Sequence, residues 1–104
     1  MMQGMMMHRP LLISDILEFA ATAYSDQEII SRRVEGDIHR ATYAQTRGRV
    51  SQLSHALVEL GVGPSDRVAT LAWNGYRHFE LYYGVSGMGA VCHTINPRLP
   101  AEQI

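Results

Sequence analysis

The sequence contains a single cysteine, Cys92, which excludes an internal disulfide and fits a reducing compartment such as the cytoplasm. It also lacks any uninterrupted apolar stretch of about 18 residues, so we expect no transmembrane helix. The methionine-rich start does not have the pattern of a signal peptide, because His8, Arg9 and Pro10 interrupt it. These absences favour a cytoplasmic protein without a membrane-spanning segment.

An excess of charge of one sign is missing as well, since nine basic residues face ten acidic ones and the net charge is −1. The pairs Arg32-Arg33 and Arg47/Arg49 are isolated and form no basic stripe, so nucleic acid is not expected as a partner. Five scattered histidines and one cysteine show no zinc-ligand spacing, and we expect no metal site. A Walker loop, a G-x-S-x-G motif and a pair of catalytic carboxylates are also missing.

A chain of 104 residues normally forms one domain, and residues 1–9 read as a flexible tail in front of it. The segment 11–24 has apolar residues at helical spacing and predicts a helix with Ser14 as its N-cap. Two runs with partial alternation, 28–34 and 37–43, flank Gly36 and predict a β-hairpin. We expect His39, on this hairpin, to be solvated because the charged Arg40 follows it.

A long amphipathic helix follows the hairpin. Thr42 and Gln45 have the spacing of a capping box, which marks its start. Gly61 predicts its end, and Pro64 follows where no helix can continue. His55 is expected on the solvated side of this helix. The apolar stripe consists of Tyr43, Val50, Leu53, Leu57 and Leu60.

The second half of the chain predicts a strand, a helix and a second strand. The run 67–73, "RVATLAW", is nearly all apolar, which is typical of a parallel strand covered on both faces. Asn74 is expected to cap the next helix, whose aromatic stripe faces the core while His78 lies at the surface. The run 90–95, "AVCHTI", is the second strand, and Asn96-Pro97 ends it. The fold class is therefore α/β, with a β-hairpin and a βαβ parallel-sheet unit flanked by helices.

Three glycines, Gly84, Gly87 and Gly89, superficially resemble a nucleotide-binding loop. In a dinucleotide fingerprint, however, the glycines leave a strand and open a helix, so that helix N–H groups face the phosphate. Here "GVSGMG" closes a helix and enters a strand, where carbonyls are exposed instead. We therefore assign these glycines to tight packing and turn formation.

Cys92 and His93 are the one adjacent pair of a nucleophile and a base. Neighbouring residues on a strand point to opposite faces, so the two cannot act together on one proton, and Cys92 is expected in the core. Ligands of open α/β sheets collect beyond the carboxyl ends of the strands. His93 and Asn96 are therefore the candidates for a substrate-facing edge. No catalytic, cofactor-binding or metal-binding residue is assigned in this chain.

From Pro10 onward the chain resembles the beginning of an AMP-forming acyl-CoA synthetase of the adenylate-forming superfamily. The blocks "LGVGPSDRVA", "WNGYRHFELYYGVSGMGAV" and "HTINPRL" follow one another in the order of that family. Each block alone is weakly specific, whereas their succession at close spacing is specific. The last two blocks are similar to fatty-acyl-CoA ligases, including those that activate 3-methylmercaptopropionate.

The resemblance implies a two-step reaction, in which ATP and a carboxylate give an acyl-adenylate and pyrophosphate, and CoA then gives the thioester. It implies ATP, Mg²⁺ and CoA for a longer parent protein, with a fatty or other small carboxylic acid as substrate; a homodimer of the parent is left open. The phosphate loop and the catalytic lysine of the family are not in this sequence. We therefore expect residues 10–104 to be a partial N-terminal domain, truncated before the phosphate-binding loop.

Two hypotheses follow for the chain itself. The first is an N-terminal fragment of an acyl-CoA ligase that is inactive alone and binds none of these ligands well. The second is a stand-alone, non-catalytic binding or assembly module of the same fold, whose sheet edges recruit a partner. The matching residues Gly61, Asp66, Gly89 and Asn96-Pro97 are fold-forming ones, so the resemblance leaves open whether this chain is itself an enzyme.

Overall fold

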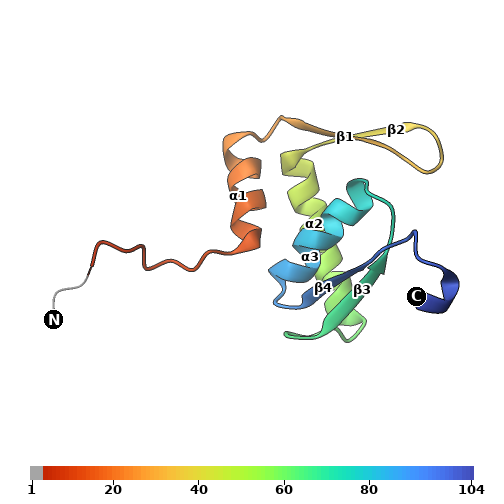
Figure 1. Ribbon diagram of the computed structural model, residues 1–104. Helices are drawn as coiled ribbons and strands as arrows, with labels where there is room; N and C mark the ends of the chain where they lie inside the picture. Colours follow the sequence, from red (N-terminus) through yellow and green to blue (C-terminus); the bar gives the residue numbers. More distant parts are fainter. Residues whose placement is uncertain (1–3) are drawn as a thin grey trace.

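Two small sheets and three α-helices make up the fold of residues 4–104, the part of the chain that the computed structural model describes (Figure 1). One sheet is an antiparallel pair and the other a parallel pair whose strands are connected through a helix. The predicted α/β class, with a hairpin and a βαβ unit, is confirmed. The elements are α1 (Ile13–Ala23), β1 (Glu28–Arg32), β2 (Ile38–Thr42), α2 (Tyr43–Glu59), β3 (Arg67–Leu71), α3 (Tyr76–Gly87), β4 (Val91–Ile95) and the short 3₁₀ helix η1 (Ala101–Gln103).

Helix α1 begins one residue before its predicted cap. Leu12 is the N-cap in an extended conformation, and the Asp15 N–H donates to the Leu12 carbonyl at 3.1 Å. The prediction of Ser14 as N-cap is therefore wrong, because Ser14 already lies inside the first turn. Of the predicted tail, residues 1–3 lie outside the described residues, and residues 4–9 form neither helix nor strand.

Strands β1 and β2 form an antiparallel hairpin that turns around Gly36. Glu28 pairs with Thr42 and Arg32 with Ile38. Gly36 adopts φ +99°, a left-handed conformation that favours glycine, and this closes the turn. The prediction of a hairpin turned at Gly36 is confirmed.

Helix α2 starts and ends as the sequence predicts. The Gln45 N–H donates to the Thr42 hydroxyl at 3.1 Å, and the Gln45 side-chain carbonyl accepts from the Thr42 N–H at 2.9 Å, which completes the capping box. Gly61 has φ +94° and follows the last turn, where a left-handed residue ends many helices. Local side-chain chemistry therefore fixes both ends of this helix.

The closest helix packing is the contact between α2 and α3. A Cβ placed on Gly84 would lie 3.0 Å from Leu53 Cδ2, so only glycine allows this approach without a shift of Leu53. The Ser54 hydroxyl donates to the Gly84 carbonyl at 2.8 Å across the same contact. Val85, beside Gly84, has 0% of its surface exposed and is the centre of the core. This contact orients α3 relative to the rest of the chain.

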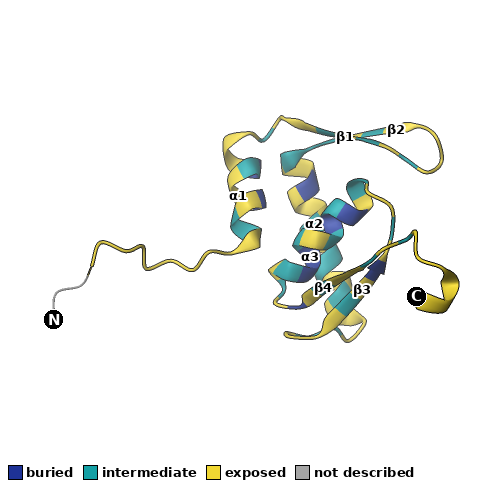
Figure 2. Cartoon of the chain, viewed as in Figure 1, coloured by how far each residue is buried: buried dark blue, intermediate teal, exposed yellow. Residues whose placement is uncertain are grey.

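The parallel pair β3–β4 is covered on one face only. Burial alternates along β3, where Arg67, Ala69 and Leu71 are exposed while Val68 and Thr70 are not (Figure 2). The prediction of a strand covered on both faces is therefore wrong for this chain. The reason is that α3 packs against one face of the pair, while Arg67, Ala69 and Leu71 on the other face of β3 are exposed. An apolar sequence run shows what a strand tolerates and does not show what covers it.

Replacing either of two glycines by alanine, one inside α2 and one directly after it, should change the stability of the chain in opposite directions. Gly48 lies in mid-helix, and a Cβ added there would meet no atom within 4 Å, so Gly48→Ala should stabilise the chain by about 0.5–1 kcal/mol. Gly61→Ala should destabilise it by about 1 kcal/mol, because φ +94° is unfavourable for alanine. Urea unfolding followed by circular dichroism measures both, and a destabilised Gly48→Ala variant would contradict the helix assignment.

Candidate functional site

The carboxyl ends of β3 and β4 border a cavity of about 440 Å³, which we call the edge cavity. Because the two strands are parallel and in register from Arg67↔Val91 to Leu71↔Ile95, their carboxyl ends meet at the same edge. This is the place where ligands of open α/β sheets bind. The lining residues are Ala72, Trp73, Asn74, His78, Thr94, Ile95, Asn96, Pro97 and Arg98.

His78 forms the buried wall of the edge cavity. Only 5% of its surface is exposed, and its Nε2 lies 2.9 Å from the Thr70 hydroxyl on β3. Its Nδ1 is buried and has no hydrogen-bond partner among the described residues. The prediction of a surface position for His78 is wrong, because the residue lies seven positions before the buried Val85 and thus on the same helix face. That spacing is the signal in the sequence that identifies it.

The rim of the edge cavity is aromatic and basic. The Arg98 guanidinium carbon lies 5.7 Å from the centre of the Trp73 ring, a cation–π contact. The predicted candidate Asn96 lines the cavity, and its Oδ1 accepts a hydrogen bond from the Arg98 backbone N–H at 3.0 Å. This bond closes the loop directly after β4, so Asn96 and Arg98 are held on the same rim.

The turn from β3 into α3 leaves the helix start without a side-chain cap. The N-cap is Gly75, in an extended conformation, and no side chain bonds to the first turn. The prediction that Asn74 caps this helix is therefore wrong. Asn74 lies one residue earlier and lines the edge cavity instead.

The other predicted edge candidate, His93, lies in the middle of β4 opposite Ala69 and is exposed. It is not part of the lining of the edge cavity, so the structure separates His93 from Asn96. Its neighbour Cys92 is half-buried, and burial raises the pKa of the Cys92 thiol. The thiol is thus kept protonated, in line with a structural role on the covered face.

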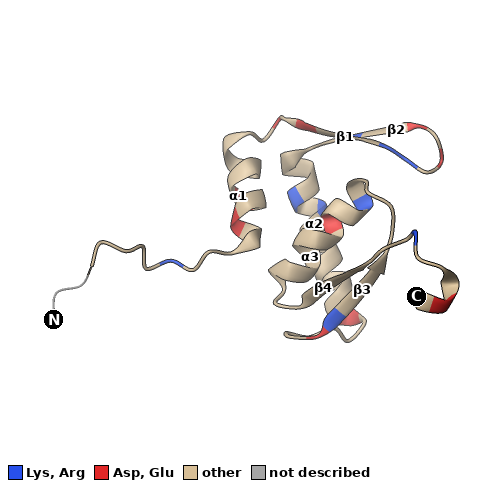
Figure 3. Cartoon of the chain, in the orientation of Figure 1, with Lys and Arg blue, Asp and Glu red and all other residues tan. Residues whose placement is uncertain are grey.

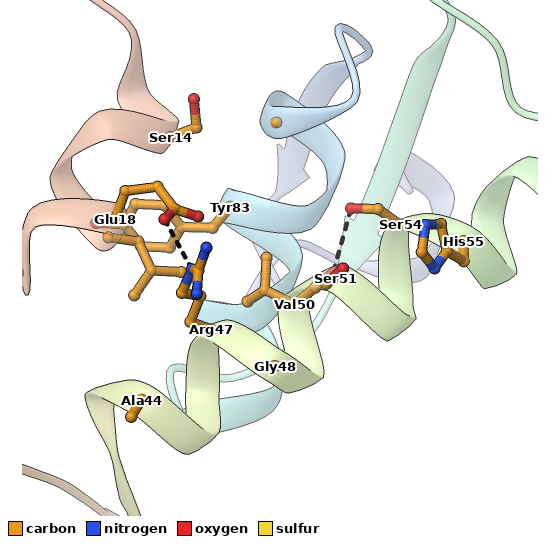
Figure 4. A pocket seen from close by; sticks show the side chains of 12 residues that line it. Ser14, Glu18, Ala44, Arg47, Gly48, Val50, Ser51, Ser54, His55 and Tyr83 are labelled. Carbon is orange, nitrogen blue, oxygen red and sulfur yellow. Dashed lines mark hydrogen bonds and ion pairs between the residues drawn. The ribbon is translucent and has the colours of Figure 1, made fainter. Parts of the chain in front are cut away.

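A second hollow, of about 530 Å³, lies between α1, α2 and α3 (Figure 4). Arg47 on α2 forms an ion pair with Glu18 on α1 at 2.7 Å, as the dashed line in Figure 4 shows. The Ser54 hydroxyl, also in its wall, is bonded to backbone carbonyls. The exposed His55 lies on its rim, as predicted for a solvated position. These groups tie the three helices together.

Tyr76 at the start of α3 anchors the hairpin next to the edge cavity. The His39 ring stacks on it with centroids 3.6 Å apart and planes 8° from parallel. Arg77 donates to Glu35 at 2.8 Å, and this hydrogen bond lowers the pKa of Glu35. The prediction of a solvated His39 is therefore wrong, since the ring is half-buried against an aromatic residue that lies far away in the sequence.

Charge is otherwise dispersed over the described residues, with basic and acidic residues interspersed along the chain (Figure 3). Within residues 4–104, no three His, Cys, Asp or Glu side chains lie close enough together to hold a metal ion. The predicted structural roles of two of the glycines are confirmed, since Gly84 meets Leu53 and Gly89 has φ +84° in a turn. In the part of the chain described, no helix is long and apolar enough to cross a membrane.

Comparison with known sequences finds a matching family and relatives that are CoA ligases. Residues 17–104 match the family described as AMP-binding enzyme. The 3-methylmercaptopropionyl-CoA ligase of Ruegeria lacuscaerulensis is 46% identical over 99% of the chain, which covers 19% of that protein. The medium-chain-fatty-acid–CoA ligase of Ectopseudomonas oleovorans is 47% identical over 99% of the chain and 19% of its own length. The chain thus spans about a fifth of the curated relatives that it matches.

Solved structures agree with the sequence relatives. The inhibitor-bound N-terminal domain of FACL13 from Mycobacterium tuberculosis has a TM-score of 0.78 at 32% identity, over 88% of this chain and 23% of that one. IdnL1 has a TM-score of 0.79 at 18% identity, over 93% of this chain and 20% of that one, which shows the shared fold alone.

Breaking one ion pair between α2 and α3 should lower the stability of the chain measurably. Glu80 is buried, with 6% of its surface exposed, and Arg49 Nε donates to it at 2.5 Å. Arg49→Met leaves that carboxylate without its partner and should lower the free energy of unfolding by about 2 kcal/mol. Arg47→Met is the matched control, because its partner Glu18 is half exposed, and it should cost less than about 1 kcal/mol. Equal losses in urea unfolding would contradict the importance of the buried pair.

Proposed function

The chain belongs to the AMP-binding enzyme family, and from this premise we propose that it forms the N-terminal part of an ATP-dependent acyl-CoA ligase. The parent reaction converts a carboxylate, ATP and CoA into acyl-CoA, AMP and pyrophosphate. The observation that carries the proposal is the match along 99% of the chain, at 46–47% identity, to two relatives that are both CoA ligases. The substrate class is a fatty or other small carboxylic acid, as the names of these relatives indicate.

We propose that this chain contributes to the fold of the parent enzyme and supplies no group that takes part in the chemical steps. Adenylate formation needs groups that stabilise charge on the transferring phosphate, and the family places a Ser/Thr/Gly-rich loop there. Such a loop is missing from this sequence, and all nine of its Lys and Arg residues are arginines, so it has no lysine to offer. Within the described residues, no three His, Cys, Asp or Glu side chains come together into a ready-made metal site. We therefore assign ATP, Mg²⁺ and CoA to the rest of the parent and expect the chain alone to be inactive.

What the chain contributes is the parallel pair β3–β4 held by α3. One face of the pair is packed on the helix, while Leu71 and Val91 on the pair are half exposed, at 56% and 49%. Parallel sheets are stable when both faces are covered. The exposed face is thus suited to further elements of the parent, which would extend the sheet and complete its core.

A chimaera tests this assignment directly. The chain replaces the matching first fifth of the Ectopseudomonas oleovorans ligase, and acyl-CoA formation from a medium-chain fatty acid, ATP, Mg²⁺ and CoA is measured by chromatography. We expect activity within about tenfold of the parent, because the replaced segment supplies fold and not catalytic groups. The control is the same ligase without its first fifth, which should be inactive. A folded chimaera without acyl-CoA formation, beside an active parent ligase, would overturn the proposal.

A further inference from the structure

We propose that residues 5–8, a run of three methionines and a histidine that we call the methionine segment, bind a Cu(I) ion through thioether sulfur and imidazole nitrogen. The segment lies before α1, and none of its residues lines the edge cavity or the hollow between the helices. The proposal is independent of the ligase reaction, because it rests on these four side chains and their surroundings.

Methionine is concentrated where the chain does not pack. Five of the six methionines fall within the first seven residues, and Met88, half-buried at the end of α3, is the sixth. Methionine normally fills gaps in a hydrophobic core. Met5, Met6 and Met7 are instead exposed, each with at least 67% of its surface accessible. Core packing therefore does not account for them, and their side chains are open to a ligand.

The donor atoms of the segment suit a soft metal ion. Thioether sulfur selects Cu(I), and imidazole nitrogen is also a good copper ligand. The exposed His8 follows Met7 directly, so four consecutive side chains offer three sulfurs and one nitrogen. The absence of a metal site expected from the sequence concerns the zinc spacing of histidine and cysteine, and thioethers are a different class of donor.

The backbone leaves the segment free to close around an ion. Residues 4–9 form neither helix nor strand, and they make none of the backbone hydrogen bonds found in the turns and loops of the described chain. Figure 1 shows this part of the chain running out from α1. Met5 and Met7 are two residues apart, a spacing at which the side chains of an extended chain point to the same side. Because all four donors lie within four residues, binding has to order only a short stretch of chain.

The neighbouring charges favour Cu(I) over hard ions. The segment contains no carboxylate, and the Asp15 carboxylate on α1 is already paired with Arg9 at 2.8 Å. Hard ions such as Mg²⁺ and Ca²⁺ prefer carboxylate and carbonyl oxygens, so the side chains of the segment offer them no ligand. The same ion pair holds the residue that follows the segment against α1 and uses none of the four donors.

The methionine methyl groups report on the site directly. The untagged 104-residue chain, in the Cys92→Ser variant so that no thiol competes for copper, is labelled with carbon-13 at its methionine methyl groups. It is titrated under nitrogen with Cu(I) supplied as its acetonitrile complex, and the methyl NMR signals are followed. We expect saturable shifts of the methyl signals of residues 5–7, while the Met88 signal stays in place as an internal control. Zn²⁺ should produce no saturable shift of these signals, because it does not favour thioether ligands.

Substitutions in the segment identify the donors. Met5→Leu combined with Met7→Leu removes two sulfurs at similar volume and should raise the half-saturating Cu(I) concentration, read at Met6, at least about tenfold. His8→Ala should raise it as well. Met88→Leu is the matched control and should change it by less than about twofold. Because the replaced side chains of the segment are exposed, circular dichroism should be the same for all variants. Shifts that do not saturate, or equal half-saturating concentrations for the double variant and Met88→Leu, would overturn the proposal.

Discussion

The close approach of α2 to α3 at Gly84 is the constraint on which the rest of the structure depends. With a hydrogen atom in place of a side chain, Gly84 lets Leu53 and the Ser54 hydroxyl reach the backbone of α3. This contact sets the rotation of α3 about its axis. The same rotation directs Glu80 towards Arg49 and His78 towards β3, although both are polar and one is charged. The buried polar groups are thus a consequence of helix phase, with the Glu80 carboxylate paired to Arg49 and His78 Nε2 placed beside the Thr70 hydroxyl.

Helix α3 connects to both the hairpin and the parallel sheet. Towards the hairpin, Tyr76 carries the stacked His39 and brings Arg77 to Glu35. Towards the sheet, α3 separates β3 from β4 in the sequence and packs against the pair, whose carboxyl ends form the edge cavity. The chain is therefore mainly a packed scaffold, which carries a cavity at the carboxyl ends of its parallel strands. This agrees with the structural share in the parent reaction that we propose for the chain.

The elements with local sequence signals were predictable from the sequence. The capping box at Thr42, the left-handed Gly61 and the hairpin turn at Gly36 each depend on a few neighbouring residues, and all are confirmed. The βαβ unit followed from an apolar run, a helical segment and a second apolar run. The family could be inferred because several such blocks stand in a fixed order, which no single block establishes.

Most of the predictions that failed concern features that depend on tertiary contacts. Whether His39 is buried is decided by Tyr76, at a sequence distance where no local pattern applies. The burial of His78 follows from its place on the helix face of Val85, a spacing that the prediction did not use. Ser14 and Asn74 have the side chains of good caps, yet the helices begin at neighbouring residues because the backbone before them is extended. For the edge cavity, Asn96 was found from the rule for parallel strands, whereas Arg98 and Trp73 carry no motif that would mark them.

The central claim is that this chain supplies fold and not chemistry, and an exchange assay tests it most directly. The purified 104-residue chain, verified as folded by circular dichroism, is incubated with ATP, Mg²⁺, a medium-chain fatty acid and labelled pyrophosphate. The account predicts no incorporation of label into ATP above a protein-free control, while the full-length Ectopseudomonas oleovorans ligase, assayed in parallel, exchanges label. Fatty-acid-dependent exchange by the chain itself, lost on His93→Ala, would contradict the account and place catalytic groups within these residues.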